Sequence, residues 1–111
     1  MKTYSLVTTQ DVTQEQIEDV MTTAFEGGSN YWIDEVTVDI EPTEKYKYMS
    51  EVLTRGGTLK VYVEGEDVIQ TLTLGRFLNA LSNEHFDFDN YDAGGADAVL
   101  QKAIFGEVIY G

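Results

Sequence analysis

The segment 82–95 comes nearest to a chemical site, because it combines acidic, aromatic and histidine side chains. Asp87 and Asp89 match the opening of an EF-hand calcium loop. The match ends there, since Tyr91 and Ala98 stand where such a loop needs an oxygen ligand and a bidentate glutamate. We therefore expect no metal site in this segment.

His85, the only histidine, lies in the same segment without the neighbours that catalysis needs. A general base requires a nucleophile and an orienting group within hydrogen-bond reach, and no serine or threonine near His85 lies in a nucleophile motif. We expect Asp92 to cap the following helix, or to favour its positive end through its charge. The alternative is an acidic and aromatic loop that faces a partner.

Paired carboxylates and paired glycines elsewhere also favour structural roles. Asp34 and Glu35 are neighbours in a predicted strand, so they point to opposite faces and do not converge on one substrate atom. The pairs Gly27-Gly28 and Gly56-Gly57 follow predicted helices, whereas a phosphate-binding loop precedes one. We expect both pairs to be helix C-caps in the left-handed conformation, and we expect no enzyme activity and no cofactor.

The composition bounds the fold and the partners. The chain has 111 residues, with 20 Asp and Glu against 7 Lys and Arg and a net charge of −13, so a single domain over 1–111 is expected. Direct nucleic-acid binding and attraction to an anionic membrane are disfavoured, because the few cations do not cluster. Cysteine is absent, which excludes disulfides and thiolate metal ligands. No signal-like or membrane-spanning apolar run occurs, so we expect a soluble, cytoplasmic protein.

The first half of the chain is predicted to form strand, helix, strand and helix. A β-rich run predicts a strand over 2–9. Thr13 is expected to cap a helix that ends at Gly27-Gly28, with a glutamine in the capping-box position. Alternation over 32–41 predicts a strand with an acidic outer face. Its expected inward residues are Trp32, Val36, Val38 and Ile40. Thr43 is expected to cap a second helix, through Arg55, that buries Tyr48, Met49, Val52 and Leu53.

The second half is predicted to form a hairpin and two helices. Strands over 59–63 and 68–73 flank a loop in which Gly65 takes a positive φ. Thr73 is expected to cap a third helix, and a fourth spans about 96–105 and ends at Gly106. The order β-α-β-α-β-β-α-α predicts an α+β fold with a small antiparallel or mixed sheet covered by helices.

The acidic charge, if spread evenly, is too dilute to imitate a nucleic acid. A folded chain of this mass exposes roughly 6,100 Å², or about one carboxylate per 300 Å². Duplex DNA carries roughly one phosphate per 100 Å². Mimicry would need most acids on one side, or a homodimer that joins them in a stripe. An acidic surface also speeds association with a basic groove without faithful mimicry.

Three segments carry a resemblance to known proteins. They are AFEGGSNYW at 24–32, RGGTL at 55–59 and AIFGEVIYG at 103–111. They resemble a family of small uncharacterised proteins of phages, prophages and related mobile elements, over about residues 14–111. The resemblance implies provenance and brings no established activity. Small acidic phage proteins resemble, as a class, inhibitors of CRISPR or restriction nucleases that occupy nucleic-acid grooves.

These observations predict a phage-derived, non-enzymatic inhibitor that binds a basic, nucleic-acid-handling surface of a bacterial defence nuclease. The expected contacts are two exposed tyrosines and ten acids: Tyr31, Tyr62, Glu35, Asp39, Glu41, Glu44, Glu64, Glu66, Asp67, Asp87, Asp89 and Asp92. One alternative is a small-ligand binder that sequesters a nucleotide defence signal, which would need Arg55, Lys60 and Arg76 to converge. Another is an accessory phage protein with a structural or replication role.

Overall fold

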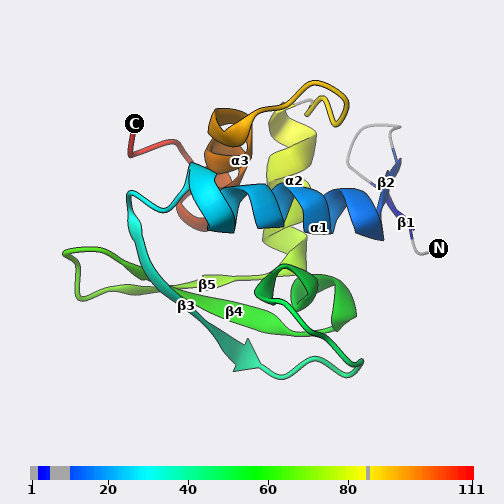
Figure 1. The fold of residues 1–111 in the computed structure, drawn as a ribbon, viewed down its shortest axis with the longest axis horizontal. Helices are drawn as coiled ribbons and strands as arrows, with labels where there is room; N and C mark the ends of the chain where they lie inside the picture. The colour runs from blue at the N-terminus through cyan, green and yellow to red at the C-terminus, as the bar shows by residue number, and fades with distance from the viewer. Residues whose placement is uncertain (1–2, 6–10, 85) are drawn as a thin grey trace.

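Two small antiparallel sheets and a layer of helices make up the fold (Figure 1). This computed structural model describes residues 3–5, 11–84 and 86–111. The strands are β1 (Thr3–Ser5), β2 (Asp11–Thr13), β3 (Ile33–Ile40), β4 (Thr58–Val63) and β5 (Ile69–Leu72). The helices are α1 (Gln14–Thr23), α2 (Leu74–Glu84) and α3 (Ala93–Phe105), with a π-helical turn η1 (Ala24–Gly28) and 3₁₀ turns η2 (Met49–Glu51) and η3 (Leu53–Arg55). The predicted α+β class is confirmed.

The described residues of the predicted N-terminal strand, 3–5, form a strand as expected. β1 pairs antiparallel with β2, and residues 2 and 6–9 of the predicted strand lie outside the described residues. β2 leads directly into α1, where the Thr13 hydroxyl oxygen accepts a hydrogen bond from the Gln16 amide and the Gln16 Oε1 accepts one from the Thr13 amide. The predicted capping box is therefore confirmed.

The main sheet has the strand order β3-β4-β5 and places helices on one face only (Figure 1). The inward side chains of β4 and β5, such as Leu59, Val61 and Leu72, are buried. The opposite face is formed by side chains that the antiparallel register brings together: Glu35 with Tyr62, Tyr62 with Ile69, Thr37 with Lys60, and Lys60 with Thr71. One face of the sheet is thus covered by the core, and the other faces solvent.

β3 departs from simple alternation at two positions. The register against β4 shifts between Ile33 and Glu35 and again between Val38 and Ile40, so Asp34 and Asp39 are the extra residues of two β-bulges. The predicted buried position of Ile40 is wrong: its side chain is 59% exposed. The bulge at Asp39 explains this, because one extra residue moves the next side chain to the opposite face.

The core lies between the helices and the inner face of the main sheet. Ile17, Val20 and Met21 line the buried side of α1, as their spacing predicts. Phe77 and Leu81 of α2 and four residues of α3 complete it, together with the strand side chains already named. The α3 residues are Val99, Leu100, Ala103 and Ile104. Full burial of such side chains stabilises the fold by roughly 1.5–3 kcal/mol each.

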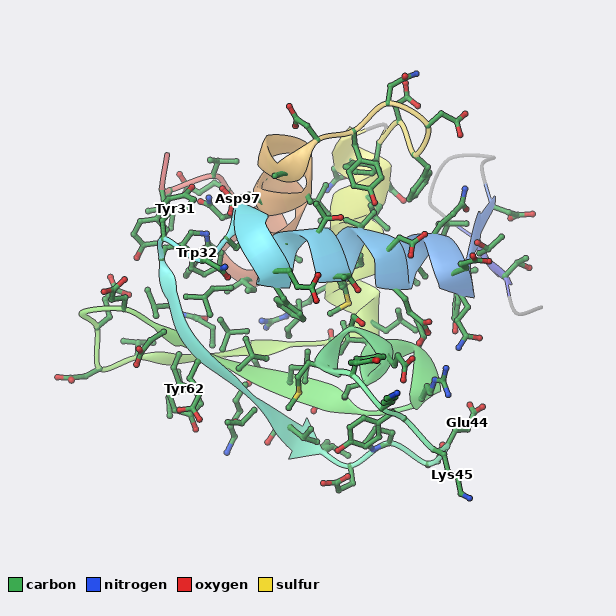
Figure 2. All side chains as sticks on the ribbon, viewed as in Figure 1. Tyr31, Trp32, Glu44, Lys45, Tyr62 and Asp97 are labelled. Atoms are coloured by element: carbon green, nitrogen blue, oxygen red, sulfur yellow. The ribbon has the colours of Figure 1, made fainter. Side chains whose placement is uncertain are left out.

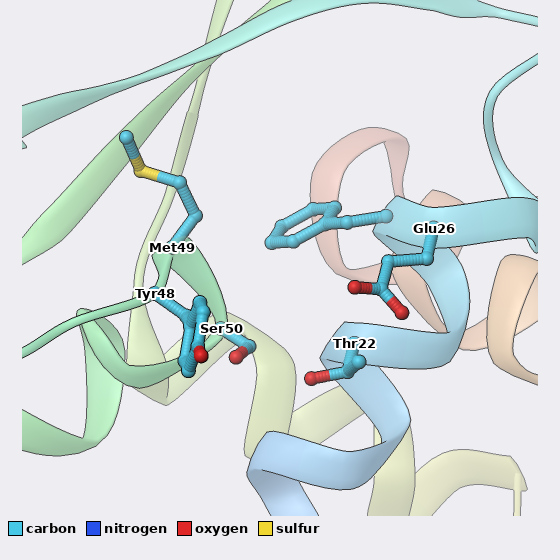
Figure 3. Close-up of a pocket in the computed structure, with 6 residues that line it drawn as sticks. Thr22, Glu26, Tyr48, Met49 and Ser50 are labelled. Atoms are coloured by element: carbon cyan, nitrogen blue, oxygen red, sulfur yellow. The ribbon is translucent and has the colours of Figure 1, made fainter.

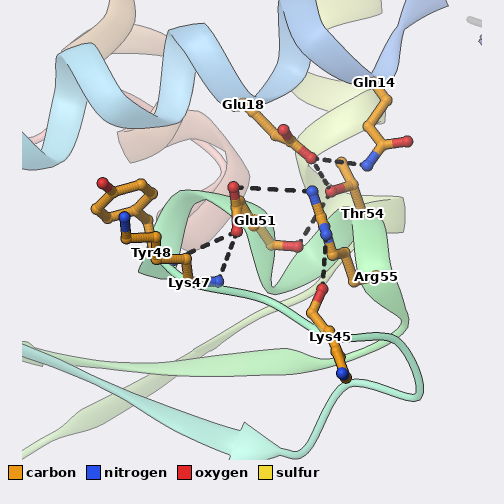
Figure 4. Close-up of polar contacts among 8 residues, drawn as sticks. All are labelled: Gln14, Glu18, Lys45, Lys47, Tyr48, Glu51, Thr54 and Arg55. Carbon is orange, nitrogen blue, oxygen red and sulfur yellow. Dashed lines mark hydrogen bonds and ion pairs between the residues drawn. The ribbon is translucent and has the colours of Figure 1, made fainter. Parts of the chain in front are cut away.

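The predicted helix from Thr43 to Arg55 does not form. Thr43 donates its hydroxyl hydrogen bond to the Arg55 carbonyl across the base of a loop, and only the short turns η2 and η3 are helical. Val52 and Leu53 are buried as predicted, but Tyr48 is 59% exposed. The physical reason is a competing local contact: the Glu51 carboxylate accepts hydrogen bonds from the backbone amides just before η2 (Figure 4).

Glu51 holds this loop in place, and its substitution should show a matching pH dependence. The amide of Lys47, 2.7 Å away, lowers the pKa of the Glu51 carboxyl most, helped by the Tyr48 amide and Arg55 and opposed by burial. A carboxyl whose pKa is lower in the folded than in the unfolded state stabilises the fold fully at pH values above the unfolded-state pKa. This stabilisation is lost as the pH falls through the lowered pKa of the folded state. Glu51→Gln should therefore cost about 1 kcal/mol of unfolding free energy at neutral pH and little in acid.

Urea unfolding of both proteins from neutral to strongly acidic pH measures this difference. Glu64→Gln, in the exposed hairpin loop, is the matched control and should stay within about 0.5 kcal/mol of the native chain at neutral pH. A Glu51→Gln cost that persists unchanged in acid would show that the carboxylate charge is not what stabilises the loop.

The remaining predicted boundaries are confirmed or moved by a few residues. Thr73 accepts a hydrogen bond from the Arg76 amide and so caps α2. Asp92 caps α3 by accepting from the Gly95 amide at 2.8 Å, so the last helix begins at Ala93, three residues before the predicted position. Gly65 and Gly106 take the positive φ expected of them. No helix in the described ranges is long and apolar enough to cross a membrane.

Candidate functional site

The predicted contact residues fall into three separate regions of the molecule. Glu35, Tyr62, Glu64, Glu66 and Asp67 lie where β3 begins and where the β4–β5 hairpin turns, and Tyr31 lies just before them. Asp39, Glu41 and Glu44 lie at the far end of β3 and in the loop after it. Asp87, Asp89 and Asp92 lie between α2 and α3, on the helical side of the molecule (Figure 1). The twelve residues therefore do not share one face.

The first region gathers exposed carboxylates from two distant parts of the sequence. Ile33 pairs with Val63, and the Glu64 amide donates to the Trp32 carbonyl at 2.9 Å, so the hairpin loop lies against the start of β3. We call its five exposed acids the acidic end: Asp34, Glu35, Glu64, Glu66 and Asp67. Segments 3–44 and 61–75, which supply them, contain no lysine or arginine. The acidic end is thus a concentrated patch of negative charge.

The bulge at the start of β3 brings two neighbouring acids of the acidic end to the surface together. The chain exposes 6136 Å², which agrees with the expected value and gives about one carboxylate per 300 Å² on average. At the bulge, Asp34 and Glu35 are both exposed instead of alternating between surface and core, so two consecutive acids face solvent. The composition gives only the number of acids, and the fold decides which of them lie side by side.

Next to Tyr31 and Trp32, just before β3, lies a buried carboxylate, Asp97, that the sequence analysis missed (Figure 2). It is 7% exposed. Asp97 Oδ1 accepts from Ser29 Oγ at 2.7 Å and from Trp32 Nε1 at 2.7 Å. Its Oδ2 accepts from the Tyr31 hydroxyl at 2.6 Å and from Gln101 Nε2 at 2.9 Å. Four neutral donors thus stabilise this charge in place of a cation. In the sequence, the spacing of Asp97 and Gln101 by one helical turn could have suggested their contact. The other three donors lie more than sixty residues away, so no local pattern predicts them.

Gln101 extends this network to the C-terminal segment 107–111. Its Oε1 accepts from the amides of Ile109 and Tyr110, both at 2.8 Å, and its Nε2 donates to the Tyr110 carbonyl at 3.0 Å. The Tyr110 ring stacks on Trp32, with ring centroids 5.5 Å apart and planes 10° apart. Burial, and then the neighbouring Glu66 carboxylate, raise the pKa of the Tyr110 phenol. The C-terminal segment therefore ties α3 to the hairpin that carries the acidic end.

Tyr31 joins the network to the surface. Its ring is 51% exposed, as predicted, but its hydroxyl is held by Asp97. The hydrogen bond to Asp97, with burial and the charge of Asp97, raises the pKa of Tyr31 above its ordinary value of 10.0. Tyr31 therefore stays a neutral donor at physiological pH and is suited to contact rather than to proton transfer. Tyr62, the other predicted anchor, is half-buried on the outer face of the sheet.

Gly28 allows α3 to approach η1 closely enough for this network. The predicted left-handed C-cap at Gly27-Gly28 is wrong, because positive φ occurs at Gly56, Gly65 and Gly106 and not at either residue. A Cβ at Gly28 would lie 2.4 Å from the Ala93 carbonyl oxygen. Glycine is needed at position 28 because a side chain would collide with the backbone of α3, and not because the backbone takes a left-handed conformation. The close approach places Asp97 next to Ser29 and Trp32.

The other sequence candidates have structural partners. Asp87 Oδ1 accepts from the Asp89 amide at 3.0 Å, and the described residues contain no group of three or more potential metal ligands. His85 lies outside the described residues. Arg55 donates to the Lys45 carbonyl, Lys60 pairs with Asp39 at 3.7 Å, and Arg76 donates to the Thr71 carbonyl. The three cations are thus engaged separately.

No protein-family profile, curated protein or solved structure matches the chain. A functional assignment therefore depends on the chemistry of the acidic end and of its supporting network.

Proposed function

We propose that this chain is a non-catalytic binding protein that docks its acidic end on a basic surface of another macromolecule. The observation that carries the proposal is the convergence of five exposed carboxylates from β3 and the β4–β5 hairpin, with no cation in the segments that supply them. Several carboxylates grouped on one surface create a stronger negative potential than isolated ones. This potential speeds association with a surface of positive charge and fixes the orientation of the two partners.

The Asp97 network supports this role by fixing the geometry of the patch. Ser29, Tyr31 and Trp32 precede β3 directly, and all three donate to Asp97. Tyr110 links the same region to Glu66 in the hairpin. A patch held by a buried network loses less conformational entropy on binding than one on free loops, which favours affinity.

The class of partner follows from the chemistry of the patch. A surface that complements closely spaced carboxylates is rich in Lys and Arg, as is a surface that binds nucleic-acid phosphates. Together with the resemblance to small phage proteins, this favours a nucleic-acid-cleaving defence protein of a bacterial host, with the acidic end imitating a short stretch of phosphate backbone. The chain would then act as an inhibitor of the CRISPR or restriction type.

Neutralising the acidic end should abolish most of the binding. The test variant combines Asp34→Asn, Glu35→Gln, Glu64→Gln and Asp67→Asn, and it spares Glu66 because Glu66 contacts Tyr110. The partner is captured from bacterial lysate on the immobilised chain at low salt and released at high salt. We expect the four substitutions to weaken its binding roughly 10- to 100-fold, and duplex DNA to compete with the native chain.

A matched variant separates position from total charge. It combines Glu15→Gln, Asp19→Asn, Glu41→Gln and Asp89→Asn, which are exposed residues outside the acidic end, and it has the same net charge as the test variant. We expect its affinity for the partner to stay within about threefold of that of the native chain, because dissolved salt screens the interaction of charges that lie far from the interface. Equal losses in the two variants, or a partner whose binding is insensitive to salt and DNA, would contradict the proposal.

A further inference from the structure

A cavity of about 330 Å³ lies between the end of α1 and the turn η2, in a different part of the molecule from the acidic end (Figure 3). Its lining residues come from two segments, one around η1 and one around η2: Thr22, Phe25, Glu26, Tyr48, Met49 and Ser50. Its volume falls in the range of small-molecule sites, roughly 300–1,000 Å³. At about 30 Å³ for each water-sized group, it accommodates a molecule of roughly ten non-hydrogen atoms.

The walls of the cavity are mostly apolar and aromatic. Phe25, Tyr48 and Met49 supply two aromatic rings and a thioether. Tyr48 and Met49 are among the large apolar side chains that remain exposed, although the sequence pattern predicted both to be buried. Such side chains around a hollow form a surface on which an aromatic ring packs well.

The polar side-chain groups of the cavity are all acceptors or hydroxyls, and those of Thr22, Glu26 and Ser50 have no partner among the residues that the structure describes. Ser50 is 8% exposed. Among the described residues, its hydroxyl makes no hydrogen bond, and neither does that of Thr22. The carboxylate of Glu26 likewise has no ion pair or hydrogen bond within the described part of the chain. Figure 3 shows the oxygen atoms of Thr22, Glu26 and Ser50 turned toward the same space.

One carboxylate and two hydroxyls at an apolar cavity favour a ligand that carries a positive charge. No lysine or arginine lines the cavity, and the whole chain carries −13. Lys47 Nζ lies 5.3 Å from the centroid of the Tyr48 ring, but Lys47 does not line the cavity. A phosphate or carboxylate ligand would meet the Glu26 carboxylate, which disfavours the anionic nucleotide considered from the sequence. An ammonium group has three donors, matching one carboxylate and two hydroxyls. Its attached ring would lie against Phe25, Tyr48 and Met49.

We propose that this cavity binds a small primary amine with an aromatic body, of roughly ten non-hydrogen atoms. The ammonium group donates to Glu26 and to the hydroxyls of Thr22 and Ser50, and the ring packs on the apolar wall. The site is independent of the acidic end, since the two share no residue.

Calorimetric titration with 2-phenylethylamine tests the proposal, with 2-phenylethanol and 3-phenylpropionate as neutral and anionic counterparts of similar size. We expect the amine to bind at least 10-fold more tightly than the alcohol, and the carboxylate to show no binding. Glu26→Gln should lower the amine affinity about 10-fold and leave the alcohol unaffected, because the carboxylate charge acts only on the cation. Glu26 is exposed and has no hydrogen bond or ion pair with the residues that the structure describes, so we expect this variant to keep the fold, which far-UV circular dichroism verifies.

Glu15→Gln is the control, since Glu15 is an exposed acid at the other end of α1 and does not line the cavity. It should bind the amine as the native chain does. Equal affinity for amine and alcohol would overturn the proposal. So would an equal loss in the two glutamate variants, which would mean diffuse attraction to an acidic protein, or no binding of the amine at millimolar concentration.

Discussion

Replacing Asp97 by alanine is expected to lower the free energy of unfolding by about 3–5 kcal/mol. The substitution removes the acceptor of four donors, from Ser29, Tyr31, Trp32 and Gln101, in a region where Asp97 itself is 7% exposed. Each buried donor left without a partner costs roughly 1–3 kcal/mol, and reorientation of the flexible ones recovers part of that. The urea midpoint should fall by roughly 2–3 M. Trp32, the only tryptophan, reports the transition by fluorescence.

Two further variants separate the causes of this loss. Asp97→Asn keeps the volume but turns one acceptor into a donor that faces other donors, so we expect an intermediate cost of about 2–3 kcal/mol. Asp34→Ala removes an exposed carboxylate in the nearby bulge and should change stability by less than about 0.5 kcal/mol. An Asp97→Ala protein within about 1 kcal/mol of the native chain would show that the network does not hold this end of the molecule together.

Gly28→Ala is expected to cost about 2–3 kcal/mol, while Gly27→Ala is neutral or stabilising by up to about 1 kcal/mol. A Cβ at Gly28 would lie 2.4 Å from the Ala93 carbonyl oxygen and 3.5 Å from the Asp97 Cβ, whereas one at Gly27 meets nothing within 4 Å. The Ala93 oxygen belongs to the backbone of α3, so relief requires the helix to move away from η1. Urea unfolding of the two variants gives the comparison.

This glycine pair is its own control, because the two residues are neighbours in one turn and have the same helix propensity. Similar losses at both positions would mean that the turn needs glycine for its backbone conformation, and the close approach of α3 would then not be the cause. A loss confined to Gly28 would place the cost at the contact with α3 that also positions Asp97.

Elements with local signals could be predicted from the sequence. Thr13, Thr73 and Asp92 cap helices as expected, because a cap depends on the residue and the next three amides. The hairpin and the buried side of α1 follow from periodicity for the same reason. The predicted helix from Thr43 to Arg55 failed where Glu51 bonds the amides that precede η2, a local alternative that apolar spacing does not reveal.

The candidate site was predicted only in part. Every acid of the acidic end except Asp34, and the exposure of Tyr31, were named from the sequence. The other predicted contact acids, Asp39, Glu41, Glu44, Asp87, Asp89 and Asp92, lie in other regions of the molecule. Asp97 was not singled out, and neither was the cavity beside η2, whose Tyr48 and Met49 the failed helix prediction had placed in the core. Both omissions concern contacts between segments that are far apart in the chain.

The sequence by itself determined the net charge of −13, the absence of cysteine, and the elements whose hydrogen bonds close within a few residues. Only the tertiary structure decided which acids gather and what holds them. Asp97 meets its donors at separations of 68, 66 and 65 residues, and the acidic end joins β3 to a hairpin about thirty residues later. Such pairings depend on strand order, on the bulges in β3 and on the close approach at Gly28. These properties arise from the packing of the whole chain, so no short window of sequence contains them.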